Sequence, residues 1–275
     1  METLIFEGSL TALTPIFTGG DEKTGIEITL RRIDYIVGEE KIAVPLVDGN
    51  SIRGVLRRLL LADFFSQVGY EIKSARIFYL FSGGALEEVS TQDSGTLNLQ
   101  VRREIRANIP PLSLFGGSIG NQAFAGKLIV SKALPVCREL ADYIPLQSKL
   151  SFHDFLTETF GTRHAEREPP ETVERNPKKE EPTIQMKYNL ETFTPGAKFY
   201  HKFMLLDATP IEKSCFARML ELWKERPFVG GKSATGYGEV KIDYPTMLFT
   251  SEAYLNFLKE RKKEIVKSLD HMAKL

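Results

Sequence analysis

The sequence predicts an α+β fold that contains a βαββαβ succession of strands and helices. Segments rich in Leu, Ile, Val and Phe, bounded by turn-forming residues, occur in both halves of the chain and are typical of strands. Other stretches repeat apolar residues at a spacing of three and four, as amphipathic helices do. The order of these segments along the chain fits a βαββαβ plan with an irregular middle.

The N-terminal part is predicted to form a strand, a hairpin and a helix. Residues 4–17 are rich in Leu, Ile, Phe and Thr and end in a glycine-rich loop at 18–21, which indicates a strand. Residues 25–47 alternate imperfectly around a Gly-Glu-Glu sequence, which favours a hairpin. From residue 51 to residue 68 the period changes to that of an amphipathic helix.

The middle of the chain is less regular. Residues 76–100 are predicted to hold strands and loops, 109–120 a loop rich in Pro and Gly, and 126–136 another strand. The segment 162–182 has eleven charged residues and four prolines among its 21. Because it has too little apolar surface to offset the entropy of ordering, we expect it to be a mobile insertion unless a ligand orders it.

The C-terminal part returns to regular elements. A proline at position 227 is expected to end a helix, and a glycine-rich loop follows it. Ser251 is the expected cap of the last helix. The expected elements are strands at 183–190 and 197–207, a helix at 211–226, a strand at 239–244 and a helix at 251–274.

Composition sets broad limits on function. The 275 residues are 42% apolar and carry 36 basic and 36 acidic side chains, so the net charge neither favours nor excludes a nucleic acid partner. The basic residues are unevenly spread, with one group between Arg31 and Arg58 and another formed by Arg102, Arg103 and Arg106. This second group fits RNA contact and ordinary protein surface equally well.

Cysteine and histidine patterns indicate neither a metal nor a disulfide. Cys137 and Cys215 lie far apart without a CxxC pattern, which excludes a zinc ribbon and argues for a reducing compartment. The four histidines are scattered without the spacing of metal ligands, so we expect no metal and no cofactor. With no apolar run long enough to span a membrane and no signal peptide, the expected location is the cytoplasm.

The segment 45–58, PLVDGNSIRGVLRR, combines a strand end, an Asp-Gly turn, a helix start and three arginines. Asn50 or Ser51 is predicted to cap the helix, which leaves other backbone amides free for an anion. Arg53 and Arg57 are four residues apart and are expected to share a helix face. Three basic residues alone would indicate a solvated surface, but the adjacent turn favours phosphate binding.

The segment 229–238, VGGKSATGYG, joins glycines, a lysine and hydroxyls. It fits either a connection that needs positive φ angles or a loop that cradles phosphate, and Lys232 favours the second interpretation. The spacing of a Walker loop is not met. Tyr237 and Phe228 flank the loop and are candidates for base stacking or for the core.

These residues carry a resemblance to the RAMP superfamily of CRISPR-associated RNA-binding proteins. Within it the chain is similar to the backbone subunits of the Cas-seven family, and most like the type IV or type I-D branch. The segments that carry the resemblance are 49–54, 111–116, 185–188, 194–197 and 230–238.

The resemblance implies an RRM-like, ferredoxin-like palm, a helical or irregular insertion, and an extended hairpin called the thumb, which crosses the guide RNA into the neighbouring subunit. The implied organisation is a single domain over 1–275, with the palm at about 1–68 and 183–250, the insertion at about 69–150, the thumb at about 151–195 and the C-terminal helix at 251–274.

The function that the resemblance implies is that of a guide-RNA-binding backbone subunit of a CRISPR effector ribonucleoprotein. The expected partners are the guide RNA, further copies of the chain in a head-to-tail filament, other effector subunits and target nucleic acid. The family's phosphate contacts carry over to Asn50, Ser51, Arg53, Arg57, Gly231, Lys232 and Ser233. The residue patterns add Arg58, Arg102, Arg103, Arg106, Gly230, Thr235 and Tyr237 as candidate RNA-binding residues.

Two other functions remain open from the sequence. Type III backbone subunits cut bound RNA with an aspartate in the loop after the first strand, and Asp21 and Asp34 are the candidates here. Their spacing to the turn motif differs from the type III pattern, so we do not expect an enzyme. The other alternative is a structural protein without an RNA role, in which the glycines form turns and the arginines are ordinary surface.

Overall fold

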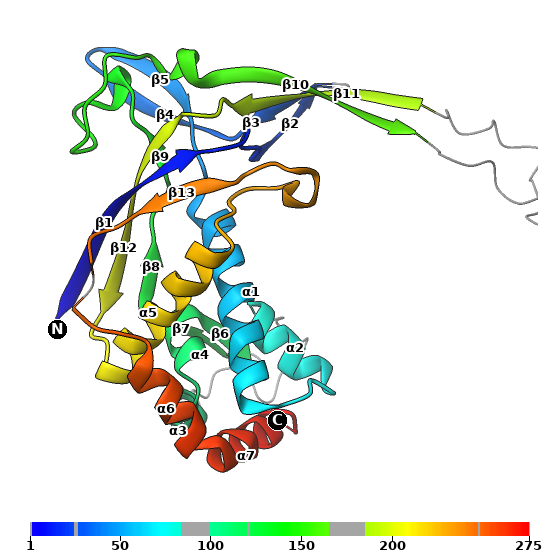
Figure 1. Ribbon diagram of the computed structural model, residues 1–275, viewed down its shortest axis with the longest axis vertical. Helices are drawn as coiled ribbons and strands as arrows, with labels where there is room; N and C mark the ends of the chain where they lie inside the picture. Colours follow the sequence, from blue (N-terminus) through cyan, green and yellow to red (C-terminus); the bar gives the residue numbers. More distant parts are fainter. Residues whose placement is uncertain are drawn as a thin grey trace, which may run out of the picture.

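A sheet of antiparallel strands forms the centre of the protein (Figure 1). Its order is β13 (Val240–Asp243), β1 (Thr3–Ala12), β12 (Lys198–Leu206) and β8 (Leu128–Val130), and β9 (Leu134–Pro135) also pairs with β12. The computed structural model describes residues 2–24, 27–83, 99–119, 122–164, 185–246 and 248–274.

Two helices pack against this sheet. Helix α1 (Gly49–Val68) lies between β1 and β8 in the chain, and α5 (Pro210–Glu225) lies between β12 and β13. Phe203 of β12 contacts Phe216 and Trp223 of α5, with ring centroids 5.4 and 6.1 Å apart. All three side chains are fully buried, so this contact anchors α5 to the sheet and forms part of the core.

The sequence explains why both helices form where they do. In α1 the side chains of Ile52, Leu56, Leu60 and Phe64 repeat every four residues, and none of them is exposed. Gly69 ends α1 with a left-handed φ of 65°. Helix α5 starts with a capping box, in which the Thr209 hydroxyl accepts from the amide of Glu212 and the Glu212 carboxylate accepts from the amide of Thr209.

A second sheet and a hairpin lie above the central sheet in Figure 1. The hairpin is β4 (Arg32–Val37) with β5 (Glu40–Pro45). The second sheet has the order β10 (Leu156–His164), β11 (Gln185–Phe193), β3 (Glu27–Leu30) and β2 (Gly19–Thr24). Strands β10 and β11 are antiparallel and extend sideways from the rest of the molecule (Figure 1). The charged segment at 162–182 falls, from residue 165, outside the described residues.

The middle of the chain differs from its prediction. Helix α2 (Ala75–Ser82) replaces the irregular strands expected near its position, because Ile77, Leu80 and Phe81 form one buried stripe along it. The expected loop at 109–120 contains a helix that begins at two prolines and ends at Gly116, where φ is 67°. The elements are α2 (Ala75–Ser82), α3 (Leu99–Asn108), α4 (Pro110–Phe115), β6 (Gly116–Ile119) and β7 (Gln122–Ala125), with short 3₁₀ helices at Arg138–Leu140, Phe152–Phe155 and Ser233–Thr235.

The helix expected at 251–274 is two helices, α6 (Glu252–Glu260) and α7 (Lys262–Met272), which meet at Arg261. Each buries its own apolar residues, such as Tyr254 in α6 and Leu269 in α7, so the break lets both follow the core. Ser251 lies at the N-terminal end of α6 as expected, but its side chain makes no capping hydrogen bond.

The α+β class predicted from the sequence is confirmed. Within the described ranges, no helix combines the length and apolar character needed to cross a membrane.

Candidate nucleic-acid interface

The segment at the start of α1 and the glycine-rich loop line one hollow of about 350 Å³. They are separated by some 180 positions in the sequence yet lie side by side, as a shared binding surface requires. The lining residues are Thr18, Gly19, Arg31, Asp48, Asn50, Ser51, Gly54, Arg58, Gly230 and Gly231. We call this the first hollow.

The segment that follows β1 joins the two sides of the first hollow. Its Phe17 carbonyl accepts from the amide of Gly231, at 2.9 Å, and so fixes the glycine-rich loop. The Thr18 carbonyl accepts from the amide of Arg31, at 3.0 Å, and the Thr18 hydroxyl donates to the carbonyl of Leu46, at 3.1 Å. The chain leading into α1 and the loop are therefore held by the same short segment.

The glycines of the loop differ in whether a side chain would fit at their positions. Gly230 has a φ of +75°, and a Cβ built there would lie 2.4 Å from the Phe17 carbonyl oxygen, so a side chain does not fit. Gly238 has a φ of +86° and would clash with the Val229 carbonyl in the same way. At Gly231 a Cβ would be 3.7 Å from Phe17, an ordinary contact. Packing therefore does not require glycine at 231, which is an exposed position on the loop.

Asp48, and not Asn50 or Ser51, caps α1, so the predicted cap was wrong. The Asp48 carboxylate accepts from the amide of Asn50, at 3.1 Å. Gly49 is already the first helical residue and is buried. A Cβ there would lie 2.6 Å from the Val130 carbonyl oxygen, so only glycine fits at this position. The helix thus begins earlier than expected, and the residue before it takes the cap.

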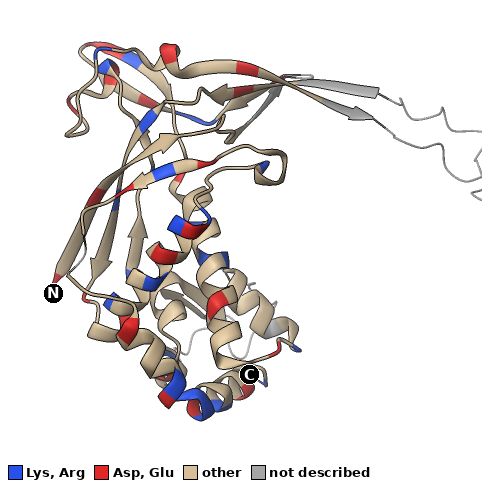
Figure 2. Ribbon diagram, in the orientation of Figure 1, with Lys and Arg blue, Asp and Glu red and all other residues tan. Residues whose placement is uncertain are grey.

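The first hollow has a small positive charge. Arg31 forms an ion pair with Asp48, with 3.0 Å between Nη1 and Oδ2, and 46% of the Arg31 side chain remains exposed. Arg58 is also exposed. Two guanidinium groups and one carboxylate give a formal charge of +1 beside the N-terminal end of α1, which suits an anion. Figure 2 shows acidic and basic residues interspersed along much of the ribbon.

Arg53 and Arg57 do not line the first hollow. Arg53 donates to the carbonyls of Leu128, at 2.8 Å, and Phe115, and Arg57 donates to the Phe115 carbonyl at 3.0 Å. Both guanidinium carbons lie over the Phe115 ring, 5.4 and 5.3 Å from its centroid. Of the three arginines predicted as one cluster, only Arg58 accompanies the glycine-rich loop.

The remaining candidates lie in other places. Arg103 lines a groove between α3 and α7, and Arg106 donates to the Ala125 carbonyl at 3.3 Å. Arg102, Arg103 and Arg106 all belong to α3, which packs against α4 and α7 at the opposite end of α1 from the first hollow (Figure 1). The cluster on α3 is thus a separate surface.

The second half of the glycine-rich loop follows the first hollow without lining it. Lys232 has a left-handed φ of 61° and precedes the 3₁₀ turn that contains Ser233 and Thr235. The Thr235 hydroxyl donates to the Lys232 carbonyl at 2.9 Å. The Tyr237 hydroxyl donates to Thr159 of β10 at 3.2 Å, so the loop also reaches the base of the β10–β11 hairpin.

Comparison with known proteins identifies the family. The family model described as "RAMP superfamily" matches residues 9–241. The chain belongs to the RAMP superfamily. The membership expected from the sequence is therefore confirmed. No curated protein matches the sequence.

A solved structure shares the fold of this RAMP protein. It is a chain titled "Type IV-B CRISPR Complex", which aligns with a TM-score of 0.66 and 22% sequence identity. The alignment covers 90% of this chain and 92% of the other. At this level of identity the match shows a common fold, and type IV is one of the two branches named from the sequence.

Asp34, one of the two candidate catalytic aspartates, does not line the first hollow of this RAMP protein. Asp34 lies on β4, where its carboxylate pairs with Lys41 of β5 at 2.6 Å on an exposed hairpin. The side chain of Asp21 lies outside the described residues. Among the described residues, no group of three or more His, Cys, Asp or Glu side chains could hold a metal ion.

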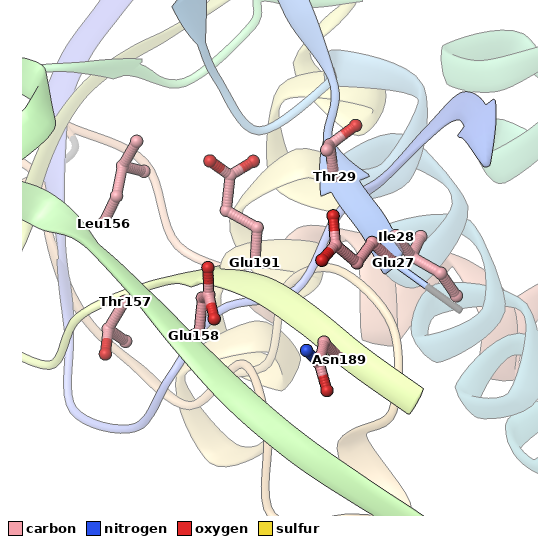
Figure 3. Close-up of a pocket in the computed structure, with 8 residues that line it drawn as sticks. All are labelled: Glu27, Ile28, Thr29, Leu156, Thr157, Glu158, Asn189 and Glu191. Carbon is pink, nitrogen blue, oxygen red and sulfur yellow. The ribbon is translucent and has the colours of Figure 1, made fainter. Parts of the chain in front are cut away.

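Sequence reasoning missed an acidic hollow of about 250 Å³ on this RAMP protein (Figure 3). It contains Glu27 of β3, Glu158 of β10 and Glu191 of β11. Glu191 accepts from the amide of Leu30 at 2.8 Å and pairs with Arg32 at 2.5 Å. The three glutamates come from strands that are far apart in the sequence, so no local sequence pattern indicates them. Their charge would repel phosphate from this side of the β10–β11 hairpin.

Proposed function

We propose that this RAMP protein is a guide-RNA-binding backbone subunit of a CRISPR effector ribonucleoprotein. In this proposal copies of the chain assemble head to tail along the guide and hold its phosphate backbone, together with other effector subunits and target nucleic acid. The observation that carries the proposal is the first hollow, where the start of α1 and the glycine-rich loop meet. The family and the shared fold with a chain of a CRISPR complex support it.

The topology of the central sheet supports an RRM-like palm. Taking only β1, α1, β8, β12, α5 and β13 gives a βαββαβ order, and the spatial order β13-β1-β12-β8 places the fourth strand beside the first and the third beside the second. We assign the palm to this sheet and its helices, the insertion to α2–α4 with β6 and β7, and the thumb to the β10–β11 hairpin.

The grip that we propose is electrostatic and independent of sequence. Arg31 and Arg58 supply positive charge, and the polar side chains of Asn50 and Ser51 supply hydrogen bonds beside the exposed Gly231. Phosphate contacts of this kind fix the register of a strand and carry no sequence information. The identity of the target would then be read by base pairing with the guide.

The position of Asp34 favours binding over RNA cleavage. Its carboxylate is engaged with Lys41 and does not line the first hollow. The carboxylate that does line the first hollow, that of Asp48, caps α1 and pairs with Arg31. We therefore propose a role in holding RNA and not in catalysis.

An electrophoretic titration against a guide-length RNA tests the proposal. Wild-type protein should bind at about 50 mM salt and lose affinity steeply towards about 200 mM, because binding releases counterions. Arg58→Glu should weaken binding at least about tenfold, a change of about 1.4 kcal/mol. Lys259→Glu makes the same charge change at an exposed position on α6 and should bind almost as wild type does. Equal affinity for the two variants, or no binding by wild type at low salt, would contradict the proposal.

A further inference from the structure

Arg53 and Arg57 form a paired cationic site on the side of α1 that faces the β6–β7 hairpin. Both line a hollow of about 470 Å³, which we call the second hollow, together with Phe115, Gly83 and Ala123. The Phe115 ring is almost fully buried and serves as a common platform for the two guanidinium groups. This shared ring and the carbonyls at the end of α4 hold the two cations close together.

The two cations have no anionic partner within the described part of the chain. No ion pair joins a carboxylate to Arg53 or Arg57 there, although Arg31, Arg32 and Arg218 each have one. The carbonyl groups satisfy several N–H donors but carry no net charge. Burial, with a smaller contribution from the charge of Arg53, lowers the pKa of Arg57 to about 10, and burial also lowers the pKa of Arg53. Arginine side chains nevertheless stay protonated at neutral pH.

Two half-buried like charges without a counter-charge are unfavourable, and an anion would relieve this. A planar guanidinium matches the oxygens of a phosphate with two parallel hydrogen bonds, and two guanidinium groups on one ring present a wide donor surface. Gly83 leaves room for this, because a Cβ there would lie 2.8 Å from Nη1 of Arg57. Ala123, on the rim, is small and exposed.

We propose that the second hollow binds a phosphodiester group of a nucleic-acid strand, separate from the one held in the first hollow. The choice of nucleic acid rests on the proposed function, whereas the anion site itself rests on the paired arginines. In a helix with about 100° between successive residues, Arg53 and Arg57 lie roughly a quarter turn from Gly54 and Arg58. The two hollows therefore lie on different faces of α1 and hold different phosphates.

The variant Ala123→Glu tests the site, with Ala123→Gln as the matched control. The new carboxylate would supply the missing counter-charge from an exposed position, so the fold is not at risk. Without phosphate in the buffer, we expect Ala123→Glu to raise Tm by about 2 °C or more over Ala123→Gln. Added inorganic phosphate should then raise Tm for wild type and Ala123→Gln but not for Ala123→Glu.

RNA titrations at several salt concentrations complete the test. Ala123→Glu should reduce the slope of log K against log salt by about 0.7, the value for one lost single-strand phosphate contact. Asn256→Glu adds the same charge to α6, away from both hollows, and should leave the slope unchanged. A loss with the guide alone assigns the phosphate to the guide, and a loss only with a guide–complement duplex assigns it to the complement.

The outcomes separate this inference from the proposed function. If Ala123→Glu and Ala123→Gln have the same Tm, phosphate response and salt slope while wild type binds RNA, the second site is overturned and the proposed function is not. If no protein binds RNA but only Ala123→Glu loses the phosphate response, the anion site is supported and the proposed function is overturned.

Discussion

Replacing His201 by glutamine should make the fold less sensitive to acid. His201 lies on the inner side of β12, fully buried, with its Nδ1 hydrogen-bonded to the Tyr244 hydroxyl. Burial lowers the pKa of His201 to about 3, from an ordinary value of 6.5. The unfolded chain therefore takes up a proton below about pH 6.5 that the folded protein does not, and stability is lost as the pH falls through that value.

The size of the effect follows from this shift. At pH 5 the unfolded histidine is about 1.5 pH units below its pKa, which at about 1.4 kcal/mol per unit amounts to about 2 kcal/mol. Urea unfolding at pH 7 and pH 5 measures it as the difference in the free energy of unfolding. We expect this difference to be about 2 kcal/mol smaller in His201→Gln than in wild type, whatever the stability at pH 7. His153→Gln removes an exposed imidazole and should leave the difference unchanged. If His201→Gln loses as much stability as wild type between the two pH values, the assignment of a buried neutral imidazole is wrong.

Three further predictions test the glycine-rich loop, the buried Glu212–Lys127 pair and the first hollow, in that order. Gly230→Ala should lower the free energy of unfolding by about 1–3 kcal/mol, because position 230 has a positive φ and a Cβ there would clash with the carbonyl of Phe17. Gly231→Ala should have little effect. Equal losses for the two variants in urea unfolding would contradict the account of the loop. Glu212→Gln should lower it by about 3–5 kcal/mol, since Glu212 is 2% exposed and pairs with Lys127 at 2.7 Å; a loss below about 1 kcal/mol would show that this pair is dispensable. Asp48→Asn should keep the cap of α1 and leave the free energy of unfolding within about 0.5 kcal/mol of wild type. It should raise RNA affinity several-fold, because it removes the only carboxylate among the described residues lining the first hollow. Weaker RNA binding would contradict this.

Local patterns in the sequence were enough to predict much of the fold. The stripe from Ile52 to Phe64 identified α1, and Pro227 correctly marked the end of α5. The strand at 197–207 was predicted almost to the residue as β12. Each of these elements buries apolar residues at its own period, so tertiary contacts reinforce the local preference.

Elements that depend on distant partners were not predictable in this way. Helix α4 consists of six residues that start with two prolines and are all buried, and its Ser113 donates to the Glu212 carboxylate nearly a hundred residues away. Lys127 completes this buried group. Nothing local distinguishes such a segment from a loop, because long-range burial and hydrogen bonds determine its conformation.

The candidate site shows the same division. The sequence brought the start of α1 and the glycine-rich loop together as one surface, and both line the first hollow. Arg53 and Arg57 were grouped with Arg58 because the three are close in sequence. In the structure the guanidinium groups of Arg53 and Arg57 lie over the Phe115 ring, on a different face of α1 from Arg58. The cap was assigned to Asn50 or Ser51 because the exact start of a helix depends on contacts such as that of Gly49 with the backbone of β8.

A double-mutant cycle on RNA affinity tests the central claim most directly. Arg58→Glu changes the α1 side of the first hollow, and Gly231→Glu places a carboxylate on the loop side at a position where a Cβ fits. If both sides hold the same phosphate, each variant should weaken binding, and the double variant should depart from additivity by at least about 0.5 kcal/mol. Two additive losses, or wild-type affinity in either single variant, would contradict the claim that the start of α1 and the glycine-rich loop hold one strand together.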